Sequence, residues 1–471
     1  MRIEATYLNE RIEMFDGVLG STRQSELETL SFLYNRYLGP VRSLNLHRPN
    51  LLDFSMYSAS CGHTRVDGLM PDLAVRPNGS DNLLVPAGGK GMNLTQPILG
   101  ALGEIGERLL TVLHFQNVVD DLVWATYAEL VRHGHRALGP EELFLFAAEQ
   151  YDQQRFPFVP FHPTTQLRWI KGKDLLTGEA VFAPAQLVLL YYKHAVGEAR
   201  IGYPTSGGLA FHADRRKAIL HGLYEFIERD AINVCWFCRL APPRIDVDVK
   251  RQLMRQGNSR HVRISTPAIE TVQIFLNSLD IRVPVITAVA FDRSCGDHSF
   301  LGGGGAAGNS ETALTQALFE LGQTRVVLRS LGPSRIRRGS GLKDMTDFLD
   351  ATVYYGFESN RSLLEWYTSS AVTVPWASLP DLTAIGKEDE YDVTLRYARS
   401  VGLKPIVFDF SDTCWPGATL VRVIVPQLTM ACVPAYPYLG HPRYYEVPQK
   451  LGFADRRLSF RDMNVDPLPF P

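Results

Sequence analysis

One short pattern, which occurs three times along the chain, decides the fold that the sequence predicts. The copies read Ala101-Leu-Gly-Glu104-Ile-Gly-Glu107-Arg108, Gly222-Leu-Tyr-Glu225-Phe-Ile-Glu228-Arg229 and Ala317-Leu-Phe-Glu320-Leu-Gly-Gln323-Thr-Arg325. Each copy places two acidic or amide side chains three residues apart, a spacing that turns both to the same face of a helix. Apolar residues lie between and beside them, so we expect three helices that pack against the body of the protein.

A glutamate on a half-buried helix costs free energy unless a cation meets it. A single copy would be ordinary, because acids at this spacing followed by arginine usually form a solvated ion pair on the surface. Three copies favour another interpretation. We expect the glutamates to converge on one bound cation or a few, with the arginines left to hold an anion.

A glycine-bearing segment precedes each of the three helices. These segments are Gly88-Gly89-Lys90-Gly91, Ser206-Gly207-Gly208, and Gly302 to Gly305 followed by Gly308-Asn309-Ser310. Glycine loops let backbone N–H groups approach a phosphate closely, and a helix N-terminus adds a favourable dipole. None of them is a Walker A loop. Together with carboxylates suited to Mg²⁺ and arginines suited to phosphate, they predict a bound nucleotide polyphosphate.

Composition places the chain among ordinary soluble proteins. It has 471 residues, of which 45% are hydrophobic and 21% charged, and its net charge of −2 gives no reason to expect nucleic acid. No apolar stretch reaches the length of a membrane span and the N-terminus does not resemble a signal peptide, so we expect a cytosolic protein. The six cysteines are too few for a disulfide framework and are expected to be buried or incidental thiols.

Helical and strand patterns alternate, which predicts an α/β or α+β class. Helices are expected from near Thr95 well past Leu110 into the apolar-rich stretch 118–131, over 140–151 and over 215–237. Strands are expected within 166–188 as a strand–turn–strand unit, and over 283–291, 405–410 and 421–425. Residues 1–85 form an N-terminal segment of unclear role, and residues 86–471 are expected to form the catalytic domain.

The last residues, Pro467-Leu-Pro469-Phe-Pro471, alternate proline with an apolar residue. Such a sequence favours an extended polyproline II conformation, which can place its last atom at little entropic cost. We expect the carboxylate of Pro471 to act in a catalytic site as a proton acceptor or orienting group. The alternatives are a disordered tail or a ligand for SH3-type partners.

Several of these motifs together resemble the YcaO family of ATP-dependent enzymes that act on peptide backbones. Besides the three glutamate motifs and their glycines, the matches include Gly172-x-Asp174-Leu-Leu-Thr-Gly178-Glu and Asp409 ahead of Val421-Arg422-Val-Ile-Val-Pro426. The resemblance implies a YcaO-type fold with ATP and Mg²⁺ as cofactors. It also implies metal ligands at Glu104, Glu107, Glu225 and Glu228, and nucleotide contacts at Lys90, Arg108, Ser206, Arg229, Glu320, Gln323 and Arg325.

The proline-rich end resembles the subgroup that forms azolines in ribosomally made peptides. The implied reaction is cyclodehydration, in which a Cys, Ser or Thr side chain attacks the preceding carbonyl and ATP phosphorylates the resulting oxyanion. Loss of phosphate then gives a thiazoline or oxazoline, a reaction of natural-product and antibiotic biosynthesis. A precursor peptide is the implied substrate, delivered by a separate leader-binding, ThiF-like partner protein; a homodimer is the general expectation.

Three alternatives stay open at this point. Thioamide or amidine formation would use the same phosphorylated intermediate. A peptide-binding scaffold without ATP turnover is suggested by Gly207, where the family usually has Asn, and by Phe211-His212-Ala213, where it has smaller residues. A carboxylate-bridged di-iron protein fits poorly, because none of the three helices carries Glu-x-x-His.

Overall fold

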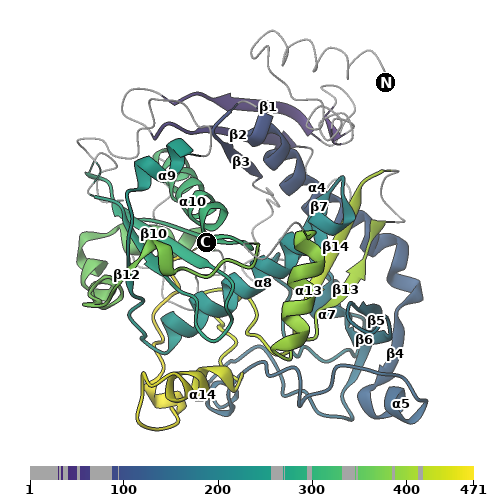
Figure 1. The fold of residues 1–471 in the computed structure, drawn as a ribbon. Coiled ribbons are helices and arrows are strands. Elements are labelled where there is room, and N and C mark those ends of the chain that lie inside the picture. The colour runs from purple at the N-terminus through teal and green to yellow at the C-terminus, as the bar shows by residue number, and fades with distance from the viewer. Residues whose placement is uncertain are drawn as a thin grey trace.

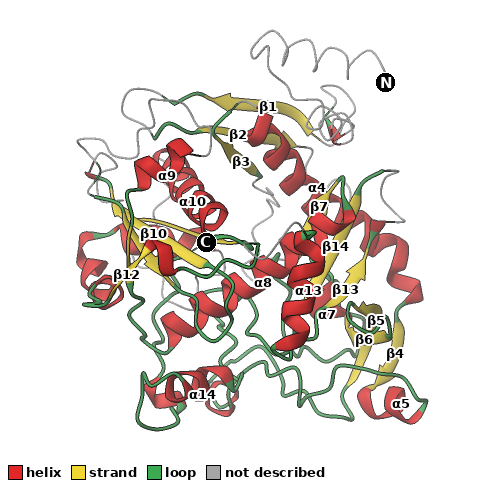
Figure 2. Ribbon diagram, viewed as in Figure 1, coloured by secondary structure: helices red, strands yellow, loops and turns green. Residues whose placement is uncertain are grey.

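The computed structural model describes residues 30, 33–34, 41–49, 54–63, 87–93, 95–255, 269, 271–293, 300–330, 345, 348–383, 388–411 and 417–470. In this part of the chain helices and strands interleave along three sheets, which confirms the predicted α/β class. Figure 2 shows the sheets as three separate groups of strands with helices between them.

The first sheet joins the N-terminal segment to the first glutamate motif. It has the antiparallel order β1 (Val41–His47), β2 (Tyr57–His63), β3 (Gly88–Gly91), and helix α4 (Thr95–Val118) packs on it. In Figure 1 this layer lies at the top of the molecule. Strands from residues 41–63 therefore pair with the glycine segment, while the domain division at residue 85 stays a prediction.

The second sheet carries the second glycine segment. Its order is β4 (Val123–Thr126), β5 (Gln166–Asp174), β13 (Ile406–Asp409), β14 (Thr419–Ile424), β7 (Leu209–His212), with β6 (Ala180–Pro184) paired to β5. All these pairs are antiparallel. Helix α8 (Arg215–Phe237) follows β7 and packs on β14 and β7. The side chain of Asp214 starts α8 by accepting the backbone N–H of Lys217 at 3.1 Å.

The third sheet carries the third glycine segment. Its order is β11 (Phe300–Ala306), β10 (Val285–Phe291), β9 (Gln273–Leu276), β8 (Arg244–Asp246), β12 (Thr373–Pro375). Strands β10 and β11 are antiparallel, and every residue of both is buried. Helix α10 (Ser310–Ser330) returns across them, with α9 (Val249–Arg255) nearby in Figure 1.

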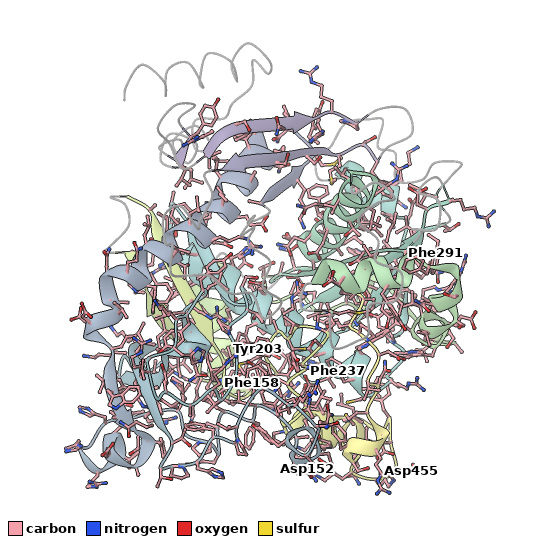
Figure 3. All side chains as sticks on the ribbon, turned by 180° about the vertical axis from the view of Figure 1, so that it is seen from behind. Asp152, Phe158, Tyr203, Phe237, Phe291 and Asp455 are labelled. Atoms are coloured by element: carbon pink, nitrogen blue, oxygen red, sulfur yellow. The ribbon has the colours of Figure 1, made fainter. Side chains whose placement is uncertain are left out.

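The remaining helices are short and surround these layers: α5 (Tyr127–Arg132), α6 (Ala148–Tyr151), α7 (Ala185–Val188), α11 (Phe348–Gly356), α12 (Glu365–Thr368), α13 (Glu390–Ser400) and α14 (Arg443–Lys450). An aromatic cluster packs in and against the core; its members include Phe146, Phe156, Phe158, Tyr203, Tyr436 and Tyr438. Figure 3 labels two of its members, Phe158 and Tyr203, whose ring centroids lie 5.6 Å apart. None of the helices in the described part of the chain combines the length and apolarity that a bilayer crossing needs.

Several predicted elements are confirmed and others are wrong. The helix over 215–237, the strand–turn–strand within 166–188 and the strands near 283–291, 405–410 and 421–425 are present. The first motif helix does not continue past Val118, and the region from Pro140 to Ala147 is not helical, so that only α6 remains of the helix expected there. The expected loop at Gly302 to Gly305 is a buried strand, and Gly88 to Gly91 is a strand in which buried and half-buried residues alternate.

Candidate active site

The same hydrogen bond occurs once in each of the three strand–helix units. A glycine N–H of the strand or turn donates to the first glutamate of the helix that follows it: Gly88 to Glu104 Oε2 at 2.8 Å, Gly208 to Glu225 Oε2 at 3.0 Å, and Gly304 to Glu320 Oε2 at 2.5 Å. These N–H groups were expected to approach phosphate, but here each binds a carboxylate. The bond turns the glutamate back over the strand and so fixes where the carboxylate lies.

Glycine is required because each helix lies almost against its strand. A Cβ at Gly89 would come within 1.7 Å of the Pro97 carbonyl oxygen on α4. A Cβ at Gly303 would come within 2.3 Å of the Ala317 carbonyl oxygen on α10. No side chain fits in either gap, so the glycines allow the helices to bring their carboxylates down to the strand amides.

The second glutamates of α4 and α8 lie in surroundings that disfavour a negative charge. Glu107 Oε1 accepts the backbone N–H of Phe211 at 3.3 Å. Burial raises the pKa of Glu107 well above its ordinary value, and the negative charges of Glu225 and Glu104 raise it further. Glu107 on α4 and Glu225 on α8 therefore face a common space, although they are far apart in the sequence.

The carboxylate of Glu228 on α8 interacts electrostatically with that of Glu320 on α10, as Glu107 does with Glu225. Burial raises the pKa of Glu228 to about 8; Arg229, whose Nη2 lies 3.4 Å from Glu228 Oε1, opposes this effect, and Glu320 and Glu225 add to it. Lys90 Nζ on β3 lies 3.8 Å from Glu320 Oε1, and this ion pair links the first unit to the third. The three motifs therefore meet electrostatically at one place.

This set of carboxylates is suited to a divalent cation. Within the described residues no three His, Cys, Asp or Glu side chains form a ready-made metal cluster. However, Glu107 and Glu228 both bind protons more tightly than a free glutamate does, chiefly because burial disfavours their charged form and also because other glutamates lie nearby. Hard oxygen donors in such surroundings fit Mg²⁺, which commonly uses one or two carboxylates together with phosphate oxygens.

Arg108 offers a hydrogen-bond donor to an anion at this place. Its Nη2 lies 2.6 Å from Glu104 Oε1, and its Nε is buried without a partner among the described residues. Burial by itself lowers the pKa of Arg108, but Glu104, Tyr191 and Glu107 together outweigh it and the pKa is raised, so the side chain stays charged. An N–H that lacks a partner inside the protein is a suitable contact for a phosphate oxygen.

A family model matches the part of the chain that carries these residues. The model for YcaO cyclodehydratases, which bind ATP and Mg²⁺, matches residues 88–429. The chain belongs to the YcaO family. The matched range contains all three strand–helix units, and ATP and Mg²⁺ are the cofactors expected from the sequence.

Relatives of this YcaO protein are known by sequence and by structure. It is 27% identical to an uncharacterized protein of Methanothermobacter thermautotrophicus over 76% of this chain and 86% of that one. It is 26% identical to an uncharacterized protein in the tfuA 3' region of Rhizobium leguminosarum bv. trifolii, over 63% of this chain and 68% of that one.

Two solved structures show the fold. A heterocyclase in complex with substrate and cofactor matches with a TM-score of 0.73 and 22% identity, over 97% of this chain and 58% of that one. YcaO from Methanopyrus kandleri, bound with AMPPCP and Mg²⁺, matches with a TM-score of 0.53 and 18% identity, over 88% of this chain and 92% of that one. The chain thus spans about three fifths of the first heterocyclase.

The remaining residues predicted to bind nucleotide in this YcaO protein are placed less uniformly. The side chain of Gln323 reaches β3, since its Nε2 would lie 2.4 Å from a Cβ at Gly88. Ser206 is half-buried in the turn before β7. Arg325 lies in the interior, where its Nε donates to Asp292 Oδ2 at 2.6 Å and both side chains are almost fully buried. For Arg325 a nucleotide contact stays a prediction.

Sequence reasoning missed Arg422 as a candidate site residue. It lies on β14, 4% exposed, and its Nη1 donates to the carbonyl of Thr205 at 2.5 Å. Its Nε has no partner within the described residues, and burial lowers its pKa to about 10 while Glu225 opposes that shift. An arginine within an apolar run was the available signal, but the run was used only to recognise the family.

The tail residues that the structure describes are buried, so the alternatives of a disordered tail and an SH3 ligand are wrong for them. Leu468 is 2% exposed and Phe470 1% exposed. The Phe470 ring packs beside Phe300 and Tyr367, with centroid distances of 6.4 and 5.3 Å. Pro471, the predicted catalytic residue, lies outside the described residues.

Proposed function

We propose that this YcaO protein catalyses ATP-dependent cyclodehydration of Cys, Ser or Thr residues in a precursor peptide. The observation that carries the proposal is the meeting of three strand–helix units at one set of carboxylates, next to the strand on which the Phe470 segment packs. Phosphoryl transfer needs little more from a protein than positioning and charge stabilisation, and this arrangement supplies both.

The acidic residues and the basic residues of the site have different proposed roles. Glu104, Glu107, Glu225 and Glu228 would hold Mg²⁺, which when bound neutralises the phosphate oxygens. Lys90 and the unpartnered Nε of Arg108 would bind phosphate, while Arg229 and Glu320 orient these groups. Each glycine N–H keeps its glutamate in place, so the site is largely pre-organised before nucleotide binds.

In the proposed reaction the peptide loses the elements of one water for each ring, and ATP is converted to ADP and phosphate. A substrate thiol or hydroxyl loses its proton and attacks the preceding carbonyl carbon, and the carbonyl oxygen takes the γ-phosphoryl group of ATP. The amide nitrogen then loses its proton, the C–O bond breaks, and phosphate leaves with that oxygen, giving a C=N bond in the ring. Phosphorylation converts a poor leaving group into a good one.

Mass spectrometry of the peptide tests the proposal directly. With ATP, Mg²⁺ and the partner protein, the peptide should lose the mass of one water for each ring, and ADP and phosphate should accumulate in step. A gain in mass from exchange of oxygen for sulfur would establish thioamide formation instead. Unmodified peptide without ATP turnover would favour the peptide-binding scaffold.

We further propose that a leader-binding partner delivers the peptide. A similar fold, at 16% identity, occurs in the E. coli microcin synthetase McbBCD complex, and this supports the proposal. Ring formation should then depend on an added leader-binding protein of ThiF-like type. Full activity of the chain alone on the peptide would contradict this. Whether the protein forms a homodimer stays a prediction for light scattering to test.

A further inference from the structure

Helix α8 links the carboxylate site to the last described residues of the chain. Its middle carries Glu225 and Glu228, and its C-terminal end contacts the segment 464–470, here called the tail segment. The Phe237 carbonyl accepts the N–H of Asn464 at 2.7 Å, and Trp236 Nε1 donates to the Asp466 carbonyl at 2.9 Å. Phe237 is buried, and Figure 1 shows the yellow chain beyond α14 rising into the body of the molecule.

The tail segment approaches the carboxylates along one face of β11. Alternate residues of a strand share a face, so positions 300, 302 and 304 point the same way. A Cβ at Gly302 would lie 3.2 Å from Phe470 Cδ1, and a Cβ at Gly304 would lie 2.8 Å from Glu228 Oε1. Phe470 and Glu228 therefore occupy neighbouring places on this face, about 7 Å apart along the strand.

Two prolines limit how the tail segment can be held in this place. Pro467 and Pro469 have no backbone N–H, so their carbonyls and the packing of apolar side chains must supply the contacts. The hydroxyl of Tyr355, on α11, donates to the Pro467 carbonyl at 2.6 Å. Tyr355 is 1% exposed, and its ring packs edge-on against Trp236 at 5.9 Å and near Phe300 at 6.1 Å.

We propose that Tyr355 is a positioning residue, whose hydroxyl fixes the Pro467 carbonyl and thereby sets Phe470 on β11 beside Glu228. This inference rests on the proposed function. Through Tyr355, α11 would take part in ring formation although it carries none of the glutamate motifs. Without the hydroxyl, the Pro467 carbonyl would be buried without its donor, and the tail segment would be free to shift along β11.

The test is Tyr355→Phe, with Tyr354→Phe as the matched control. Both remove one hydroxyl from the same helix, and the control leaves the bond to Pro467 intact. Loss of one hydrogen bond of ordinary strength predicts that kcat for ring formation falls about 3- to 10-fold in Tyr355→Phe. KM for ATP should stay at the wild-type value, and the control should keep wild-type kcat.

A double-mutant cycle separates positioning from a general loss of structure. Phe470→Leu loosens the same segment, so adding Tyr355→Phe to it should reduce kcat much less than Tyr355→Phe does alone. Effects that simply multiply, an unchanged kcat in Tyr355→Phe, or a loss in Tyr354→Phe of the same size would overturn the proposal. A wild-type chain that forms no rings with its partner would instead refute the proposed function.

Discussion

At the scale of single residues, the buried glutamates are held near one another at an energetic cost that bound cations can relieve. Glu228 lies among Glu225, Glu320 and Arg229, and its pKa of about 8 means that the folded protein binds a proton there more tightly than the unfolded chain does. This cost is typical of functional sites rather than of residues selected for stability.

Glu228→Gln should abolish ring formation while the protein stays folded. The amide has nearly the same shape as the carboxylate but carries no charge for a cation, so turnover should fall by at least about 100-fold, the size typical of losing a key charge-stabilising group. Circular dichroism would confirm the fold, and Glu104→Gln should behave alike. Both variants forming rings at the wild-type rate would contradict the metal assignment.

The same substitution should change how stability depends on pH. Because the pKa of Glu228 is raised in the folded state, its contribution is present below the unfolded value near 4.5 and is lost as pH rises toward 8. The metal-free wild type should lose stability over this range, by up to about 1.4 kcal/mol per pH unit for this one group. Urea unfolding at several pH values would show a flatter dependence in Glu228→Gln; identical slopes would disprove the assigned shift.

At the scale of elements, each glycine strand lets a helix approach more closely than any other residue would allow. Gly303→Ala would force a methyl group against backbone atoms of α10, at 2.3 Å from Ala317 O and Leu321 N. We expect destabilisation of about 1–3 kcal/mol, together with weaker nucleotide binding, because Gly304 and Glu320 would separate.

Gly103 provides the control for this prediction. It lies inside α4, where an added Cβ would meet only the Phe211 carbonyl at an ordinary 3.8 Å. Gly103→Ala should therefore stabilise the helix by about 0.5–1 kcal/mol. Thermal unfolding of the two variants should shift in opposite directions. A shift in the same direction would show that close packing is not what the glycines provide.

The tail segment makes a second prediction at this scale. Deleting residues 470–471 removes the ring that packs on Gly302 but leaves the glutamates and Arg108 in place. Ring formation should drop sharply, while the affinity for nucleotide, measured by calorimetry, stays close to that of the wild type. A fully active deletion variant would show that this end of the chain has no part in the reaction.

At the scale of the whole molecule, long elements with strong patterns were predictable and the glycine strands were not. Helix α8 was predicted at its observed bounds from the glutamate motif and its apolar neighbours, and the structure adds the cap at Asp214. Strand β11 has four consecutive glycines, which carry no side chains from which a period of two could be read.

Tertiary contacts explain the other errors. The segment after Pro140 has the acids of a helix start, but Glu142 binds Arg136 while Leu143 and Phe146 enter the core. After Val118 the chain joins β5 as β4 instead of continuing α4. The sequence motifs were enough to select the glutamates and Lys90 as candidate site residues. Their glycine partners were not predictable, although the separations of 16, 17 and 16 residues were present in the sequence.

Binding of Mg²⁺ and nucleotide should stabilise the whole protein, because all three units contribute to the same site. At a concentration of 100 times Kd, the gain is about 2.7 kcal/mol. At one fixed concentration of ligand the gain should be larger at pH 8 than at pH 6, since the raised pKa values of Glu107 and Glu228 make protons compete with the cation and weaken its binding at the lower pH. Melting temperatures with a non-hydrolysable ATP analogue would measure this; no difference between the two pH values would exclude these glutamates as ligands.

Because its glycines have no side chains, only the backbone of β11 separates the groups that pack on its two faces. Helix α10 presses on it at Gly303 and Gly305, while Glu228 and Phe470 lie against the opposite surface at Gly304 and Gly302. A displacement of α10 on nucleotide binding would therefore be transmitted through this strand to the tail segment without any intervening side chain to absorb it. Strand β11 would then couple the use of ATP to closure of the ring.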